Sequence, residues 1–171
     1  EKVDQGRIAD INIANNVIRG VQGFGINAYA KSAGAPLEAD LQSLSITGNN
    51  IDGLGPAHVE ISAAIRVFGD EGSDIQGTNI TNNSIGAVVA NGIYVACHAG
   101  TAPKQPARVR RTSIQGNSID TVSGNSSTGI RVTQDGDLAS ILHTSVSSNT
   151  IGIQISAASA SVLYGISYAA G

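Results

Sequence analysis

The sequence is poor in charged and aromatic side chains, which make up 13% and 4% of its 171 residues. It contains neither Met nor Trp, and its single cysteine excludes an internal disulfide. The formal net charge of −3 is unlike the strongly basic surface of a nucleic-acid-binding domain. No apolar run reaches the roughly 18 residues of a membrane helix. We therefore expect neither nucleic-acid binding nor membrane insertion.

Few residues of the chain are of the types that bind metals through nitrogen or sulfur. One cysteine and three histidines make a structural zinc site a poor fit, and we expect no metal and no cofactor. The length fits a single domain over residues 1–171. Because the chain starts at Glu1 and has no Met, we expect it to be a piece of a longer chain.

A repeated segment is the strongest feature of the sequence. Its template is Ile or Val, any residue, then Asn, Gly or Ser, then Asn, any residue and Ile. The shared asparagines are 33, 34, 34 and 32 residues apart. The five copies are Ile13–Ile18, Ile46–Ile51, Ile80–Ile85, Ile114–Ile119 and Val146–Ile151. Self-similarity at this period is typical of solenoids, in which each unit packs against its neighbours.

A second motif follows later in each repeat, with Gly or Ala, then Ile, any residue, and Val or Ala. Its copies are Gly25–Ala28, Ala64–Val67, Gly92–Val95 and Gly129–Val132, with a weaker copy at Gly165–Tyr168. Both motifs alternate apolar and polar residues, which indicates β-strands. A short unit of strands cannot bury its apolar residues alone, whereas stacked copies can. We predict an all-β, single-stranded parallel β-helix of about five coils, with one ~33-residue repeat per coil.

The repeated asparagine has a structural explanation. An Ile three residues before it and an Ile two residues after it cannot both point inward on a straight strand. The chain must bend, and we place the bend at this Asn, which tolerates the left-handed backbone region. Asparagines stacked in successive coils can also bond to one another. We therefore predict an asparagine ladder along the solenoid axis.

The order Asn-x-Ile and then Gly-Ile-x-Val resembles the right-handed parallel β-helix repeat of the pectate-lyase superfamily. It looks most like the phage tailspike branch of that superfamily. The resemblance implies a right-handed coil and a homotrimer, located in a virion tail or outside the cell. It does not imply one chemistry, because the superfamily includes polysaccharide lyases, glycoside hydrolases, adhesins and non-catalytic spike segments.

The second motif places polar and aromatic residues in outward columns along the axis. If its Ile and Val residues point inward, the residues between them point outward. The first column contains Asn27, Arg66, Tyr94 and Arg131, and the second contains Tyr29, Phe68, Ala96 and Thr133. Two residues further along each strand, a third column contains Lys31, Asp70, His98 and Asp135.

These columns contain the candidate site residues. We expect Arg66, Tyr94, Arg131 and Phe68 to bind a sugar ring or a uronate carboxylate. Asp70 and Asp135 are candidate catalytic carboxylates, because paired carboxyl groups serve as acid and base in glycoside hydrolysis. His98 between them is a candidate proton acceptor in a lyase.

Alternative interpretations of these residues remain open. Asp70 and Asp135 each lie next to glycine-containing segments and also suit ordinary turns. The Arg and Tyr side chains can simply cover the sheet, and His98 can be an exposed residue at a strand end. We expect Cys97 to point inward as a small apolar residue.

Three functions are compatible with the sequence. The first is a phage tailspike-like segment that recognises bacterial surface polysaccharide. The second is a polysaccharide depolymerase, either a lyase or a glycoside hydrolase, so that enzymatic activity stays open. The third is a structural shaft without a ligand. The tail from Ile153 to Gly171 has no charged side chain, which suits burial against other subunits of a homotrimer.

Overall fold

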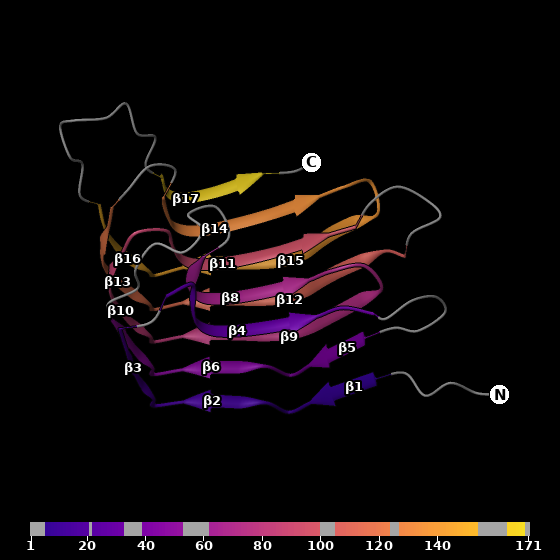
Figure 1. Ribbon diagram of the computed structural model, residues 1–171, viewed down its shortest axis with the longest axis horizontal. Coiled ribbons are helices and arrows are strands. Elements are labelled where there is room, and N and C mark those ends of the chain that lie inside the picture. The colour runs from indigo at the N-terminus through magenta and orange to yellow at the C-terminus, as the bar shows by residue number, and fades with distance from the viewer. Residues whose placement is uncertain are drawn as a thin grey trace.

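The chain forms a parallel β-solenoid without helices in the part that a computed structural model describes (Figure 1). The described residues are 6–20, 22–32, 39–52, 62–99, 105–123, 127–153 and 164–169. The prediction of an all-β solenoid is confirmed. The solenoid has about four turns and not five, because five passes through a sheet enclose four complete turns.

Three parallel sheets form the walls of the solenoid. The first contains β1 (Gly6–Ala9), β5 (Ala39–Gln42), β9 (Ser73–Thr81), β12 (Ala107–Gln115) and β15 (Ala139–Ser147), together with β2 (Asn12–Ala14) and β6 (Ser45–Thr47). The second contains β3 (Val17–Arg19), β7 (Asn50–Asp52), β10 (Ser84–Val88), β13 (Ser118–Val122) and β16 (Thr150–Ile153). The third contains β4 (Phe24–Ala30), β8 (Ala63–Gly69), β11 (Asn91–His98), β14 (Thr128–Asp135) and β17 (Tyr164–Ala169).

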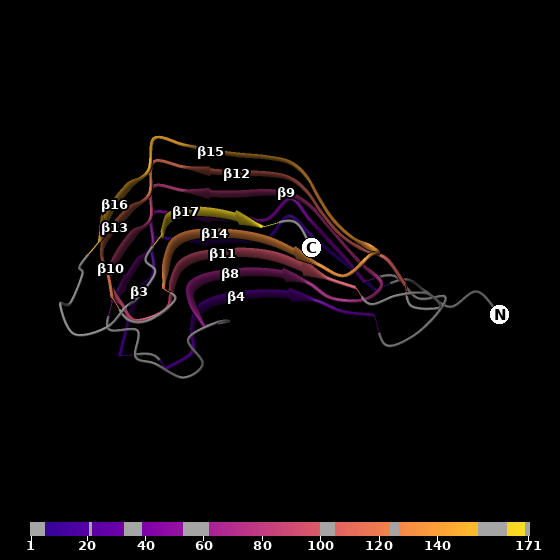
Figure 2. The same ribbon diagram turned by 90° about the horizontal axis from the view of Figure 1, so that it is seen from above.

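The first and third sheets face each other across the core, and the second sheet closes one side (Figure 2). Stacked columns of β-branched residues fill the interior. Ile46, Ile80 and Ile114 pair in register in the first sheet and are fully buried. Ile65, Ile93 and Ile130 do the same in the third sheet. These residues belong to the two sequence motifs, which therefore supply much of the core.

The asparagine ladder is confirmed. Asn83 donates from its backbone and its side chain to Oδ1 of Asn117, at 3.0 and 2.9 Å. The same Asn83 amide donates to the Ile46 carbonyl of the preceding coil at 2.9 Å. Asn49 donates to Oδ1 of Asn83 in the same way, from its backbone and its side chain. The buried amides thus find partners in both neighbouring coils.

The position of the bend is a correction to the sequence-based prediction. The left-handed residue is the one before each ladder asparagine, and it has positive φ in every coil: Asn15, Gly48, Asn82, Gly116 and Ser148. The ladder asparagine must aim both its backbone N–H and its amide at the next coil. The preceding residue therefore takes the backbone turn.

A second left-handed column was not expected from the sequence. It comprises Asp10, Ser43, Gly77, Arg111 and His143, five residues before the first column. It separates β1 from β2 and β5 from β6. Only one of its five members is glycine, so no turn signature marks it. The chain is therefore bent twice in each coil along the first sheet.

Replacing a ladder asparagine in the middle of the stack tests its contribution. In Asn83→Ala, the Asn49 backbone N–H and the Ile46 carbonyl lose their Asn83 partner, whereas the Asn49 side-chain amide keeps the Ile13 and Thr47 carbonyls. Each unsatisfied buried polar group costs about 1–3 kcal/mol, so we expect a loss of roughly 2 kcal/mol or more. Urea unfolding measures it. The exposed Asn79→Ala in the same coil is the control and should change stability by less than about 0.5 kcal/mol. Equal losses in both variants would contradict the ladder's role.

Cys97 points into the core, as expected, and is 1% exposed. Burial raises the pKa of its thiol to about 12, since a thiolate is unfavourable among apolar side chains. We expect a thiol reagent at pH 8 to leave the folded protein unmodified and to react with one thiol in denaturant. Rapid labelling of the folded protein would contradict this placement.

Candidate ligand-binding face

The outer surface of the third sheet brings together the residues selected from the sequence. Arg66 lies next to Asn27 on one side and Tyr94 on the other, and Tyr94 lies next to Arg131. The second column has the expected order, with Tyr29 beside Phe68, then Ala96 and Thr133. Residues from different coils thus become neighbours, because parallel strands pair one to one about 4.8 Å apart.

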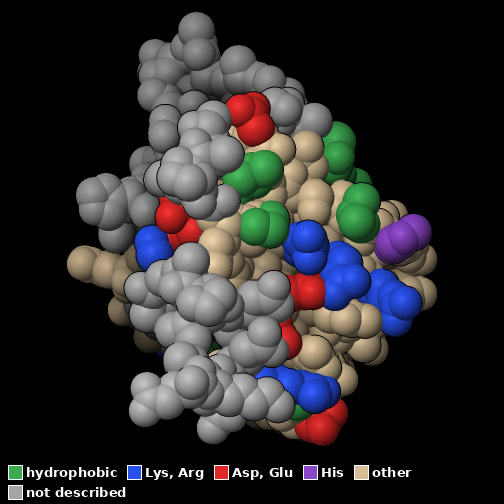
Figure 3. Space-filling view, turned by 90° about the vertical axis from the view of Figure 1, so that its right-hand side faces the viewer, with side chains coloured by type: hydrophobic (Ala, Val, Ile, Leu, Met, Phe, Trp, Pro, Cys, Tyr) green, Lys and Arg blue, Asp and Glu red, His purple; other side chains and the backbone are tan. Residues whose placement is uncertain are grey.

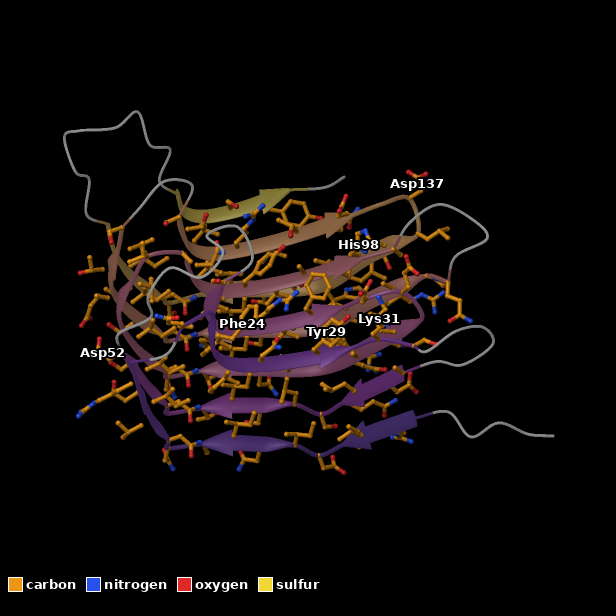
Figure 4. All side chains as sticks on the ribbon, viewed as in Figure 1. Phe24, Tyr29, Lys31, Asp52, His98 and Asp137 are labelled. Carbon is orange, nitrogen blue, oxygen red and sulfur yellow. The ribbon has the colours of Figure 1, made fainter. Side chains whose placement is uncertain are left out.

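Aromatic side chains are concentrated on this surface. The chain has two Phe and four Tyr, and four of these six residues lie on β4, β8 and β11: Phe24, Tyr29, Phe68 and Tyr94. The Tyr29 and Phe68 rings stack with centroids 5.9 Å apart and an angle of 24°. Figure 4 shows Phe24, Tyr29, Lys31 and His98 spread along this sheet.

Arg66 lies among these rings. Its guanidinium carbon is 4.1 Å from the Phe68 centroid and 4.8 Å from that of Phe24. A third ring, Tyr29, lies 5.9 Å away. Burial lowers the pKa of the Arg66 guanidinium from its ordinary value. Arg66 Nε is buried without a hydrogen-bond partner, so its interactions here are chiefly with aromatic faces.

Tyr94 does not offer the open ring that the sequence led us to expect. Its register is as predicted, but the side chain is only 7% exposed and packs with Ala63 and Ala96. The Arg131 guanidinium carbon lies 5.4 Å from its ring centroid. Thr133 donates to the Tyr94 hydroxyl at 3.3 Å. The more accessible ring of the face is Tyr29, which is 45% exposed and was not among the predicted site residues.

Asp70 is the centre of a polar cluster at the ends of these strands. Its Oδ2 accepts from the Tyr29 hydroxyl and the Lys31 ammonium, each at 2.9 Å. Its Oδ1 accepts from the backbone N–H of Glu71 at 2.9 Å and lies 3.2 Å from His98 Nδ1. Burial opposes the charged carboxylate, but these four partners outweigh it and hold the pKa of Asp70 well below its usual range.

The predicted column of Asp70, His98 and Asp135 is brought together. Nε2 of His98 lies 3.8 Å from an Asp135 oxygen, so the ring stands between two carboxylates. Asp135 is the last residue of β14, and its side chain is 80% exposed. The turn interpretation also holds for Asp70, because it precedes the turn at Glu71 and Gly72 and accepts from the Glu71 N–H.

Three potential metal ligands lie in this cluster. One atom each of Asp70, Glu71 and His98 falls within 4.8 Å of the others. However, the Lys31 ammonium already contacts Asp70 Oδ2. A metal ion would compete with that cation, so the donor set fits an internal ion-pair cluster better.

Charged residues also lie near the N-terminal ends of the strands of the first sheet. These strands follow the strands of the third sheet along the chain. Arg110 forms two hydrogen bonds to the Asp74 carboxylate and one to Gln76 at 3.3 Å. Figure 3 looks onto this end of the molecule, where basic and acidic side chains lie among uncharged ones. Among the described residues of this end, basic and acidic side chains are mixed and form no large basic surface.

Searches against protein-family models, curated proteins and solved structures gave no match for this chain. Within the described residues there is no helix of the length and hydrophobicity required to cross a membrane. The outer surface of the third sheet, with its aromatic rings and the Asp70 cluster, is therefore the candidate functional site.

Acid titration of stability tests the polar cluster. Because folding lowers the pKa of Asp70, its contribution is present above the unfolded pKa of about 4. It is lost as the pH falls below that value. We expect the free energy of unfolding, measured in urea between pH 3 and 7, to fall on acidification. Asp70→Asn should be less stable at pH 7 and should show a smaller fall. Asp120→Asn, at an exposed position outside the cluster, is the control and should titrate like the wild type. An Asp70→Asn titration that parallels the wild type would contradict the cluster.

Proposed function

We propose that this chain binds a bacterial surface polysaccharide through the third sheet, as a segment of a phage tailspike-like β-helix protein of the pectate-lyase superfamily. The observation that carries the proposal is the concentration of four of six aromatic residues, with Arg66 and Arg131, on one sheet face. An exposed tyrosine offers an apolar face and a polar hydroxyl, which suits a sugar ring.

The Asp70 cluster supplies polar groups next to the aromatic ones. Tyr29 belongs to both, because its ring stacks on Phe68 while its hydroxyl donates to Asp70. Lys31 and His98 are half exposed around the same carboxylate. A glycan lying along the axis would contact rings from one part of the strands and charged groups from the other. A few polar groups beside an apolar surface are the usual composition of a ligand site.

Depolymerase activity is the second candidate, supported by the approach of His98 to two carboxylates. Its weakness lies in Asp70. A general acid must carry a proton near the working pH, but the partners of Asp70 lower its pKa and keep it ionised. An ionised Asp70 can still serve as a base or a nucleophile, so Asp135 or His98 would have to supply the acid. Binding is the first candidate because the aromatic face supports it without requiring any such acid.

A shaft without a ligand is the third candidate. It draws support from the first sheet, whose outward column of Asn12, Ser45, Asn79, Ser113 and Ser145 is uncharged and polar. In such a shaft the rings of the third sheet would only cover the sheet, which does not account for the exposed ring of Tyr29. A homotrimer in a phage tail or outside the cell is part of the proposal. Most of the uncharged tail that suggested the trimer lies outside the described residues.

Binding to a panel of acidic and neutral bacterial polysaccharides tests the proposal. We expect one class to bind, with Tyr29→Ala reducing affinity at least tenfold. Tyr29→Phe is the matched control, since it keeps the ring that stacks on Phe68 and should retain most of the affinity. A reducing-end assay on the same samples tests for cleavage. Release of ends that Asp135→Asn or His98→Ala abolishes would favour the depolymerase. Absence of binding across the panel, or full affinity in Tyr29→Ala, would overturn the proposal.

A further inference from the structure

Large apolar side chains are exposed chiefly at the two ends of the solenoid. Among the described residues six such side chains are exposed, and all six lie on strands of the first or the last coil. One of them, Tyr29 on β4, belongs to the candidate ligand-binding face. Ile8 and Val17 belong to the first coil and are 61% and 64% exposed. The last coil contributes Leu142, Ile166 and Tyr168, which are 46%, 56% and 64% exposed.

Three of these residues occupy core columns. Ile8 pairs with Leu41, which is 6% exposed, and Ile75 in the next coil is fully buried. At the other end Ile166 pairs with the fully buried Ile130, and Tyr168 pairs with Val132. The same positions are thus buried wherever another coil covers them. At the last coil a hollow of about 320 Å³ is lined mainly by Val132, Ile141, Val146, Ile166 and Tyr168.

The last coil has no charge that would oppose strand pairing at its edge. Residues 139–153 and 164–169 contain no Asp, Glu, Lys or Arg. Exposed strand edges are usually protected from association by charged residues, especially lysine. The edge formed by β15, β16 and β17 has no such protection in the described residues.

The two ends also have complementary positions in the asparagine ladder. In each coil the ladder residue donates to Oδ1 of the asparagine that follows it, as Asn16 does to Asn49 and Asn117 does to Asn149. Asn149 therefore has the donor position at one end. Asn16, at the other end, has the acceptor position.

We propose that the first coil of a second copy of this chain stacks on the last coil, head to tail, and continues the solenoid. In that arrangement β1 of the second copy pairs with β15 in the way that β15 pairs with β12. Gly6 of the second copy then lies opposite Ala139, just as Ala139 lies opposite Ala107. The Asn16 amide oxygen of the second copy accepts from Asn149, and Ile8 covers the hollow. The contact repeats the coil-to-coil packing already present within the chain. It requires that the first and last coils are free to stack, and it does not depend on polysaccharide binding.

A head-to-tail contact uses different surfaces on the two copies, so it leaves a free end and does not close. Light scattering on the wild-type chain should therefore show a mass that rises with concentration and exceeds that of a dimer. Ile8→Glu blocks the first coil, and Tyr168→Glu blocks the last coil. Each variant alone should be monomeric. Mixed in equal amounts, they should form a dimer of twice the chain mass. The unblocked last coil of Ile8→Glu can pair with the unblocked first coil of Tyr168→Glu, and both outer ends of that dimer are blocked.

Both substitutions are at exposed positions, and far-ultraviolet circular dichroism checks that the β-structure is retained. Asn79→Glu, exposed on the middle of the first sheet, is the matched control and should associate like the wild type. Three results would overturn the inference. These are a monomer at all concentrations, a closed trimer that both end variants leave intact, and a mixture of the two variants that stays monomeric.

Discussion

The structure depends on the hydrogen bonds that buried asparagine amides form between coils. A parallel solenoid has to turn a corner in every coil, and the turn leaves backbone groups facing the interior. Asn49, Asn83 and Asn117 satisfy these groups with a side chain that both donates and accepts. Because the same residue recurs in each coil, every corner lies directly above the one before. The register of all three sheets follows from this alignment.

That register produces the candidate site. Arg66 and Tyr94 are far apart in sequence, yet they pair directly across neighbouring strands. Asp70 receives partners from β4, from its own turn and from β11, so one carboxylate links three successive coils. Few charges occur in the chain, and burial strengthens the interactions of those that meet. The site is therefore built from coil stacking and not from a local motif.

The repeat in the sequence was sufficient to predict the β-solenoid, the ladder and the outward columns, because they follow from side-chain alternation and from a constant period. The low exposure of Tyr94 was not predictable, since it depends on how its ring packs with Ala63, Ala96 and Arg131. The left-handed backbone at Arg111 and His143 was also missed, because neither residue type signals it. Lys31 was placed in the correct column, but its contact with Asp70 requires the positions of the side chains.

The corner position before the ladder has an alternating composition with a consequence for the length of the molecule. Asn15 lies against Gly48, where an added Cβ would come within 2.6 Å of the Asn15 amide oxygen. Asn82 lies against Gly116 in the same way. A side chain placed above Asn15 or Asn82 at this corner would therefore have to displace the asparagine amide. A coil with glycine at this corner can follow either kind of coil, so a single glycine coil can be duplicated without a new contact. Growth of such a protein by internal duplication would force an amide to shift only where one asparagine coil comes directly above another.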